Sequence, residues 1–441
     1  MTYSEMKDSG VPWIGEIPSH WRITKTLHCL SMPITDGPHT TPELYDEGIP
    51  FISAEAVSCG NGRIDFTHMR GYISEDFYEE CCKKYIPQID DIYMIKSGAT
   101  TGRVAIVDTH SKFTIWSPLA AFRANRERVL PKFLFYALQS DSYQKQVELG
   151  WTYGTQQNIG MRTLETLKVC LPPLDEQTTI AAHLDRQFSV IDSIIDEAKA
   201  SIEEYKRWKT SVIYQAVTKG LDPDAPMKDS GISCIGTIPS AAKVSRVNFH
   251  YEIILGKMLC PFPLDDSYTL EPYYCAANVH FEGIASDELK EMWFNEVEKE
   301  RYLVKCGDLL VVEGGAGAGG CAIAGETIRS AYIQNSIMIV RPKGKQDIRF
   351  LRYLIEMLVN RGYMEYICNK ATIPHFTKEK LAAVPYPLFN ENDAVEISDY
   401  LDRKCAEIDA IISEKKSLIA ELEAYKKSLI YEAVTGKRKV G

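Results

Sequence analysis

The chain has 441 residues, enough for two or three domains, with 45% hydrophobic and 25% charged residues, as in ordinary water-soluble proteins. No apolar run approaches the roughly 20 residues of a membrane helix, no signal-like segment opens the chain, and the cysteines are scattered without zinc-ligand spacing, so we expect a cytoplasmic protein. The net charge of −10 weighs against strong binding of nucleic acid by the chain alone, although a basic face can lie opposite an acidic one.

The first globular segment is predicted to span residues 1–173 and to mix strands with helices. Short β-like runs occupy 49–53, 92–95 and 104–107, and Gly and Pro punctuate them, which favours a turn-rich sheet. A helical stretch is predicted over 132–149.

A glycine-rich loop, Lys96-Ser-Gly-Ala-Thr-Thr-Gly-Arg103, follows the second of these strands. It lacks the spacing of a nucleotide-binding P-loop and of the dinucleotide fingerprint, so nucleotide binding is disfavoured. A plain hairpin turn explains the glycines in any case. Four of its side chains could donate to DNA phosphates or base edges, namely Lys96, Thr100, Thr101 and Arg103.

A second polar loop, Tyr153-Gly-Thr-Gln-Gln-Asn-Ile159, follows the helical stretch. Gln156, Gln157 and Asn158 have amide groups that can bond adenine through two hydrogen bonds. Such side chains equally well cap the local backbone, so both interpretations stand.

A long helix is predicted over 174–220. Its apolar side chains recur in alternating steps of three and four, interrupted only at Lys209. This spacing is a heptad seam, a stripe of side chains that faces a partner helix. The seam residues are Phe188, Ile191, Ile195, Ile202, Tyr205 and Val212.

The second half repeats the first after a linker, Leu221-Asp-Pro-Asp-Ala-Pro226. The stretch 6–19 recurs as 227–240 with 10 of 14 positions identical, and 184–218 recurs as 401–435 with 18 of 35 identical. We therefore predict a second globular segment over 221–388, with strands at 308–312 and 336–340 and a helix at 348–359. The result is a duplicated, pseudo-two-fold chain.

The counterparts of the two polar loops differ from the originals in side-chain chemistry. The loop Glu313–Gly320 has Glu and Gly where the first copy has Lys96 and Arg103, so the two loops cannot make the same contacts. The counterpart of the second loop, 371–378, carries the candidate DNA-contacting residues Thr372, His375 and Lys378.

The second long helix is predicted over 389–437, with Lys415 and Lys426 interrupting its seam. Its seam residues are Ile408, Ile412, Ile419, Leu422 and Leu429. Two equivalent seams in one chain most economically pack on each other, and a two-fold relation makes the pairing antiparallel. The alternative is two independent amphipathic helices, each lying on its own domain.

Enzyme motifs are missing, and four segments together resemble a family without catalytic activity. Trp13-Ile-Gly-Glu-Ile-Pro-Ser-His-Trp21, Gly98-Ala-Thr-Thr-Gly-Arg-Val-Ala-Ile106, Leu171-Pro-Pro-Leu-Asp-Glu-Gln177 and the run Ile180–Asp185 are similar to segments of the specificity subunit of type I restriction–modification systems. The second copy departs from this pattern, with Ala241-Ala242 for His20-Trp21 and a junction at 385–392 that we read as about three residues longer.

The resemblance implies an α/β (mixed α+β) chain in which two target-recognition domains are separated by helices that form an antiparallel intramolecular coiled coil. Each domain would read one half of a split, asymmetric double-stranded DNA target, and the helices would set the spacing. The helices would also dock two methyltransferase subunits carrying S-adenosylmethionine, and restriction subunits using ATP and magnesium would join. This chain would hold no cofactor or metal itself and would be the non-catalytic component.

Two other functions remain open on the sequence. A non-DNA coiled-coil scaffold that holds two protein partners fits the acidic charge. An enzyme with a site between the domains has no supporting motif.

Overall fold

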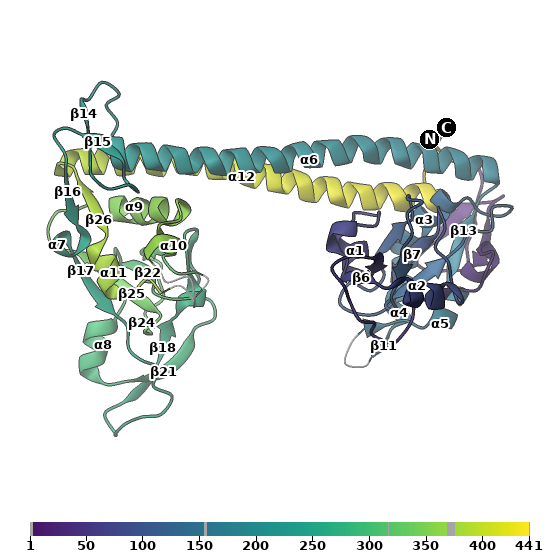
Figure 1. Ribbon diagram of the computed structural model, residues 1–441, viewed down its shortest axis with the longest axis horizontal. Helices are drawn as coiled ribbons and strands as arrows, with labels where there is room; N and C mark the ends of the chain where they lie inside the picture. Colours follow the sequence, from purple (N-terminus) through teal and green to yellow (C-terminus); the bar gives the residue numbers. More distant parts are fainter. Residues whose placement is uncertain (1–2, 154–156, 316, 368–374, 441) are drawn as a thin grey trace. The chain divides into compact units, whose positions relative to one another are not determined.

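The computed structural model describes residues 3–153, 157–315, 317–367 and 375–440 (Figure 1). It divides into two compact units: unit 1 comprises Met1–Ala198 with Lys416–Gly441, and unit 2 comprises Lys199–Lys415. Each unit therefore contains one globular segment and a part of each of two long helices, α6 (Leu174–Lys219) and α12 (Glu391–Val434). The prediction of a mixed α/β chain with two duplicated globular segments and long paired helices is confirmed.

Unit 1 is built from short strands and short helices. Its strands are β1 (Met6–Asp8), β2 (Glu16–Pro18), β3 (Arg22–Lys25), β4 (Thr35–Asp36), β5 (Ile49–Ile52), β6 (Gly71–Ile73), β7 (Ile92–Ile95), β8 (Val104–Ile106), β9 (Thr114–Ile115), β10 (Leu119–Phe122), β11 (Thr152–Tyr153), β12 (Gln157–Asn158) and β13 (Lys168–Leu171). Its helices, besides α6 and α12, are α1 (Ala54–Cys59), α2 (Glu75–Cys82), α3 (Pro131–Gln139), α4 (Asp141–Leu149) and α5 (Met161–Thr166), with 3-10 turns at Thr26–Cys29 and Phe66–His68.

Unit 2 has a similar, although not identical, order of elements. Its strands are β14 (Met227–Asp229), β15 (Thr237–Pro239), β16 (Lys243–Arg246), β17 (Tyr251–Leu255), β18 (Thr269–Tyr274), β19 (Val279–His280), β20 (Gly283–Ile284), β21 (Lys290–Phe294), β22 (Leu309–Val312), β23 (Cys321–Ile323), β24 (Tyr332–Ile333), β25 (Ile337–Pro342) and β26 (Pro385–Leu388). Its short helices are α7 (Val247–His250), α8 (Glu296–Tyr302), α9 (Ile348–Asn360), α10 (Tyr363–Ile367) and α11 (Lys378–Ala383), with a 3-10 turn at Ala276–Asn278.

Two sheets form the centre of each unit and match in strand order. The four-stranded sheets run β4-β10-β7-β8 and β17-β25-β22-β23, and the three-stranded sheets run β6-β5-β9 and β21-β18-β24. The central strand β7 is buried on both faces: Ile92 and Met94 enter one core cluster, and Tyr93 and Ile95 enter another. This two-sided burial explains why β7 is an uninterrupted apolar run, since successive side chains of a strand point to opposite faces.

A buried ion pair sits at the start of β7 and is repeated in unit 2. Arg123 donates from Nε and Nη2 to the two carboxylate oxygens of Asp91 at 2.8 and 2.7 Å. Arg341 makes the same fork to Asp308 at 2.7 and 2.8 Å. Both carboxylates are buried, so each pair satisfies a charge that would otherwise be costly in the core.

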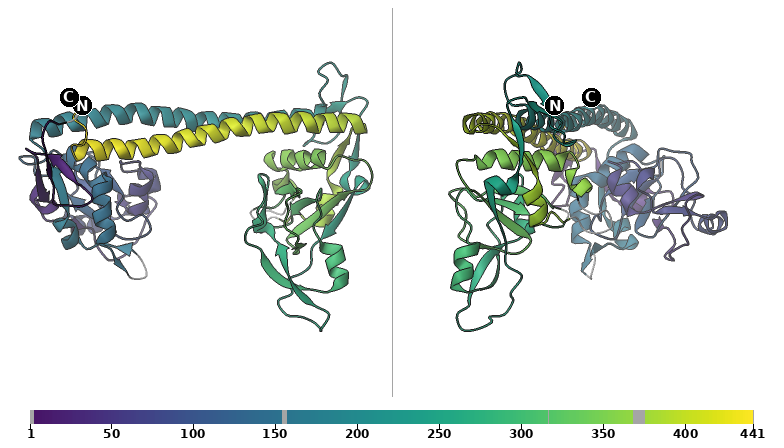
Figure 2. Two further views of the ribbon diagram at one scale, coloured as in Figure 1. Left: turned by 180° about the vertical axis from the view of Figure 1, so that it is seen from behind. Right: turned by 60° about the vertical axis from the view of Figure 1, so that its left-hand side comes forward.

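The two long helices lie side by side and run in opposite directions within each unit (Figure 2). In unit 1 the Lys426 ammonium lies 2.6 Å from Asp192 Oδ1, and in unit 2 the Lys209 ammonium lies 2.7 Å from Asp409 Oδ2. The two pairs are related by the internal repeat, since both partners shift by 217 positions. Lys209 and Lys426, two of the three lysines that interrupt the predicted seam, therefore make matched bridges between the helices.

Seam side chains lie at the helix contact in the described part of each unit. Ile191, Ile195, Ile202, Ile408, Ile412 and Leu429 are buried, and Phe188, Tyr205, Val212, Ile419 and Leu422 are half-buried. In unit 1 the Lys426 ammonium also lies 4.5 Å from the centre of the Phe188 ring. Parts of each seam thus cover apolar area of the other helix.

Two segments singled out by the sequence meet in unit 1, where the Lys439 ammonium also lies 5.8 Å from the centre of the Tyr3 ring. Glu176, from the junction segment, accepts hydrogen bonds from Tyr3 Oη at 2.7 Å and Trp21 Nε1 at 3.0 Å, and its other oxygen lies 2.5 Å from His20 Nε2. Burial alone would raise the pKa of Glu176, but the bonds from Tyr3, His20 and Trp21 outweigh it and hold that pKa below its ordinary value. The neighbouring Gln177 is fully buried and bonds the backbone of Leu130, Arg128 and Pro172.

Two expectations about local structure are wrong. The helical stretch 132–149 is two helices, because Ser140 leaves the helical conformation and its Oγ caps α4 by accepting from Tyr143 N–H. The second junction carries no extra residues: β13 and α6 begin at Lys168 and Leu174, and β26 and α12 begin 217 positions later at Pro385 and Glu391.

Candidate nucleic-acid interface

The two polar loops of unit 1 lie against each other. The first is the hairpin connection between β7 and β8, and the second contains the β11–β12 hairpin. Gly98 N–H donates to Gln157 O at 3.0 Å, and Ile159 N–H donates to Lys96 O at 2.9 Å. Six candidate residues lie on these two adjoining loops, namely Lys96, Thr100, Thr101, Arg103, Gln157 and Asn158, while Gln156 lies outside the described residues.

Lys96 is held by an internal ion pair. Its ammonium is largely buried, 3.3 Å from Oδ2 of the buried Asp36, which also pairs with Lys84 and lies 3.2 Å from His39 Nε2. Burial favours a raised pKa for Asp36, but the hydrogen bond and charge of Lys84 and the charge of Lys96 outweigh it and lower that pKa. Lys96 therefore positions the base of the loop, and the exposed part of Lys84 carries positive charge to solvent.

The other candidates of unit 1 keep hydrogen-bonding capacity for a ligand. Arg103 is exposed and uses one guanidinium nitrogen, Nη1, on Ser58 O at 2.8 Å. Thr101 Oγ1 donates to Gly98 O at 2.7 Å, which stiffens the turn, while Thr100 is half-buried. Gln157 and Asn158 are exposed, and their side-chain amides make no hydrogen bond within the described part of the chain.

Unit 2 repeats this juxtaposition with different side chains. Gly314 bridges His375, and Phe376 N–H donates to Glu313 O at 2.6 Å, so the two counterpart loops also meet. A Cβ at Gly314 would meet the His375 ring at 2.8 Å, which explains the need for glycine there. His375 is exposed and Lys378 half-buried, while Thr372 lies outside the described residues.

The two units therefore share the backbone arrangement of the two loops but differ in the side chains that these loops carry. The loop of unit 1 begins with Lys96 and ends with Arg103, whereas that of unit 2 begins with Glu313 and ends with Gly320. Donors and acceptors on a common framework are the means by which proteins read different base edges.

The cluster around Asp36 has no motif in the sequence. Asp36, His39 and Lys84 come from separate segments, and only the fold brings them to Lys96. Arg70 belongs to the same neighbourhood, with its guanidinium 4.3 Å from the centre of the Trp116 ring. The sequence carries only a weak signal, the glycine Gly37 next to Asp36, whose counterpart is Gly256. In the structure a Cβ at Gly37 would collide with the carbonyl oxygen of Ile115, and Gly256 is equally confined by Gln334.

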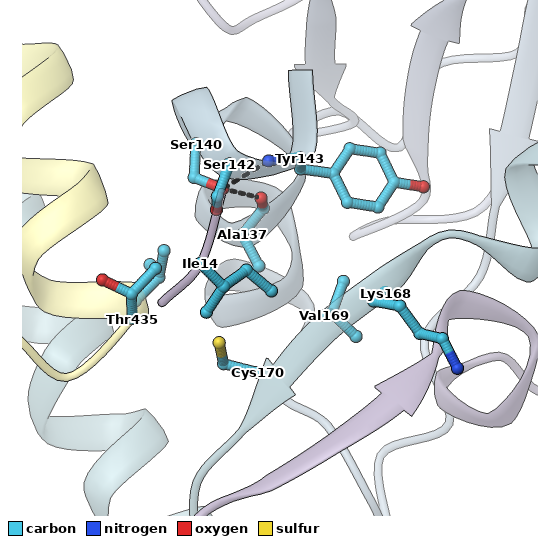
Figure 3. A pocket seen from close by; sticks show the side chains of 10 residues that line it. Ile14, Ala137, Ser140, Ser142, Tyr143, Lys168, Val169, Cys170 and Thr435 are labelled. Carbon is cyan, nitrogen blue, oxygen red and sulfur yellow. Dashed lines mark hydrogen bonds between the residues drawn. The ribbon is translucent and has the colours of Figure 1, made fainter. Parts of the chain in front are cut away.

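One small cavity lies away from this site, among Ile14, α3, α4, β13 and the end of α12 (Figure 3). Its volume of about 10 Å³ holds at most one water molecule. Ser140 and Ser142 are 3.0 Å apart at its wall. It is a packing defect and not a ligand site.

Neither a metal cluster nor a membrane-spanning helix is found in the described ranges. No group of three or more His, Cys, Asp or Glu side chains there could hold a metal ion. No helix in those ranges is both long and apolar enough to cross a bilayer.

Comparison with known proteins finds similarity to specificity subunits of type I restriction enzymes. The family model for the type I restriction modification DNA specificity domain matches residues 38–204. The putative type I restriction enzyme MjaX specificity subunit of Methanocaldococcus jannaschii is 27% identical over 438 residues, which cover 97% of this chain and 96% of that protein. A putative type I restriction enzyme specificity subunit of Haemophilus influenzae is 29% identical over 138 residues, 31% of this chain and 34% of that protein.

A solved structure supports the fold. It belongs to a study of complex assembly and conformational transition of the type I R-M system, and it matches with a TM-score of 0.70 at 16% identity, covering 95% of this chain and 98% of its own.

Proposed function

We propose that this chain is a specificity subunit of a type I restriction–modification system, and that it selects the DNA target for a complex whose other subunits carry out the chemistry, because the family model and the relatives that it resembles are of that kind. In this role the chain is the non-catalytic component. Unit 1 reads one half of a bipartite site in double-stranded DNA, and unit 2 reads the other half.

One observation carries the proposal: the same two loops meet in both units, with different polar side chains. Gln157 and Asn158 in unit 1 offer the paired donor and acceptor that fit adenine, and Arg103 offers a guanidinium fork that fits guanine or phosphate. Unit 2 presents His375 and Lys378 in the corresponding place. The two half-sites therefore differ in sequence.

The long helices have two parts in the proposal. They set the gap between half-sites, as the geometry of dimeric DNA readers does. They also dock two methyltransferase subunits, and the exposed aromatic residues Trp208 and Tyr425 are natural anchors because they occupy repeat-equivalent positions. One anchor then serves each methyltransferase copy.

Cofactors belong to the partners in this proposal. The methyltransferase subunits bring S-adenosylmethionine, and the restriction subunits bring ATP and magnesium. The acidic net charge of −10 fits this arrangement, since the partners can supply many of the phosphate contacts.

The proposal is tested by changing one unit at a time in the assembled methyltransferase complex. We expect Gln157→Ala with Asn158→Ala to relax the methylated motif only in the half-site of unit 1, and Lys378→Ala to affect only the other half. Each lost base contact should reduce discrimination at its position by about 1–3 kcal/mol. If both sets of variants leave the motif unchanged, these loops do not read DNA.

A further inference from the structure

One surface loop in each unit joins the first strand of the four-stranded sheet to the middle strand of the three-stranded sheet. These connecting loops are residues 37–48, between β4 and β5, and residues 256–268, between β17 and β18. Each begins at a glycine, Gly37 or Gly256, that the neighbouring backbone approaches too closely for any Cβ. The same element therefore occupies the same place in both units.

Both connecting loops expose large apolar side chains. In unit 2, Met258 is 76% exposed, Phe262 76% and Leu264 75%, and Leu259 between them is also exposed. In unit 1, Leu44 and Tyr45 are each nearly half exposed. Scattered exposed leucines are ordinary, but four large apolar side chains within seven residues form a patch of the kind that marks an interaction site.

The connecting loops are acidic as well as apolar. Residues 37–48 contain Glu43, Asp46 and Glu47 but no lysine or arginine. Residues 256–268 contain Asp265 and Asp266, and their one cation, Lys257, is buried with its ammonium 2.9 Å from Trp293 O and bonded to Glu298. Carboxylates without cations repel DNA phosphates and attract a surface rimmed by lysine or arginine.

The pseudo-two-fold relation separates the two kinds of surface. Surfaces that read different half-sites must differ between the units, as the Lys96–Arg103 and Glu313–Gly320 loops do. Surfaces that bind two copies of one protein must instead be alike, as the connecting loops are in charge and apolar character.

We propose that the connecting loops form a second contact with the methyltransferase subunits, in addition to the long helices, with one copy for each unit, through an apolar patch on that subunit bordered by basic side chains. This inference rests on the proposed function. The connecting loop of unit 1 begins beside the candidate interface, since Ser117 N–H donates to Pro38 O at 3.3 Å and Lys96 N–H donates to Pro118 O at 2.8 Å. A subunit held here lies at the edge of the reading surface, within reach of a base extruded from the duplex for methylation.

The test uses the full chain co-expressed with the methyltransferase encoded beside it, with the number of bound copies measured by native mass spectrometry and sedimentation. Phe262→Ser with Leu264→Ser should weaken binding of one copy at least about tenfold, because buried aromatic anchors dominate such interfaces. Leu44→Ser with Tyr45→Ser should weaken the other copy. Phe249→Ser is the matched control, since Phe249 is 67% exposed in α7 of unit 2, outside the connecting loop.

Charge reversal gives a second, independent readout. Asp265→Lys with Asp266→Lys should slow association severalfold at low salt, with a smaller effect at high salt. The proposal is overturned if the apolar variants, with thermal unfolding like that of the Phe249→Ser control, bind both copies with wild-type affinity. It is also overturned if these variants weaken DNA binding by the chain alone, since the connecting loops would then be DNA contacts. If the wild-type chain captures no methyltransferase at all, the proposed function itself has failed.

Discussion

Glu176 is the residue through which the junction segment holds the N-terminal signature in unit 1. Its carboxylate bonds Tyr3, His20 and Trp21, whereas its repeat counterpart Asp393 exchanges hydrogen bonds, among the residues that the structure describes, only with the exposed Asn390. The second copy has alanines in place of His20 and Trp21, so the simpler contact there follows from the missing partners.

We expect Glu176→Gln to lower the free energy of unfolding of unit 1 by about 1–3 kcal/mol, because charge-assisted hydrogen bonds are lost around a partly buried group. Asp393→Asn, the matched control, should cost less than about 0.5 kcal/mol. Urea unfolding monitored by tryptophan fluorescence measures both, and equal effects of the two substitutions would refute the role given to Glu176.

The pH dependence of the same contact has a definite sign. The pKa of Glu176 in the folded state lies below its ordinary value of 4.5. Its carboxylate therefore stabilises unit 1 fully above that ordinary value, and the contribution is lost as the pH falls through the folded-state pKa. As the pH falls from 4.5 through the folded-state pKa, the wild type and Glu176→Gln should converge in stability, and a stability difference that stays constant on acidification would contradict this.

The buried fork between Arg123 and Asp91 predicts a larger effect. Arg123→Met leaves the Asp91 carboxylate in the core without its cation, which should cost about 3–5 kcal/mol. Arg126→Met is the control, because the Arg126 side chain is exposed and its pair with Asp90 lies at the surface. Thermal unfolding that shows the same midpoint for both variants would mean that the fork contributes little.

At the scale of elements, the lysine bridges between the helices specify register. We expect Lys426→Glu to destabilise unit 1 by about 1 kcal/mol and Asp192→Lys to restore part of the loss in the double variant, as for partly exposed ion pairs. A double-mutant cycle by chemical denaturation measures the coupling. Strictly additive effects would show that Lys426 and Asp192 do not interact.

The elements differ in how far the sequence determines them. Alternation of three and four residues predicts the long helices and their pairing, because a single stripe has to be buried, and the two-fold relation of the repeat makes the pairing antiparallel. The same pattern presents Lys209 and Lys426 only as interruptions, since their partners Asp409 and Asp192 lie about 200 residues away or more. Ser140 was missed as a break because its capping role depends on backbone geometry that apolar periodicity does not report.

The candidate site shows the same limit. Glycine content and amide side chains identify both polar loops, but their contact through Gly98 and Gln157 depends on sheet topology. The ion-pair cluster at Asp36 could not be predicted from the sequence, because most of its partners come from other segments of the chain. Gln156 and Thr372, which lie outside the described residues, remain predictions.

At the scale of the whole molecule, the duplication joins two readers through two helices, and the helix length is then the determinant of the gap. Removing one heptad from each helix at repeat-equivalent places, Glu197–Glu203 and Glu414–Ala420, preserves both lysine bridges and the seam. Seven residues span about 10 Å of helix, close to 3 base pairs. The methylated motif should therefore keep both half-sites and lose about 3 base pairs from its gap, and an unchanged gap would contradict the spacing role.

The most direct test of the central claim is to map methylated adenines in cells that express the neighbouring methyltransferase with and without this chain, by single-molecule sequencing. If this chain selects the target, the methylated adenines fall in a bipartite motif with two different halves and a fixed gap, and this motif is methylated only when the chain is expressed. A stable complex that produces no new methylation, or methylation that persists without the chain, would contradict it.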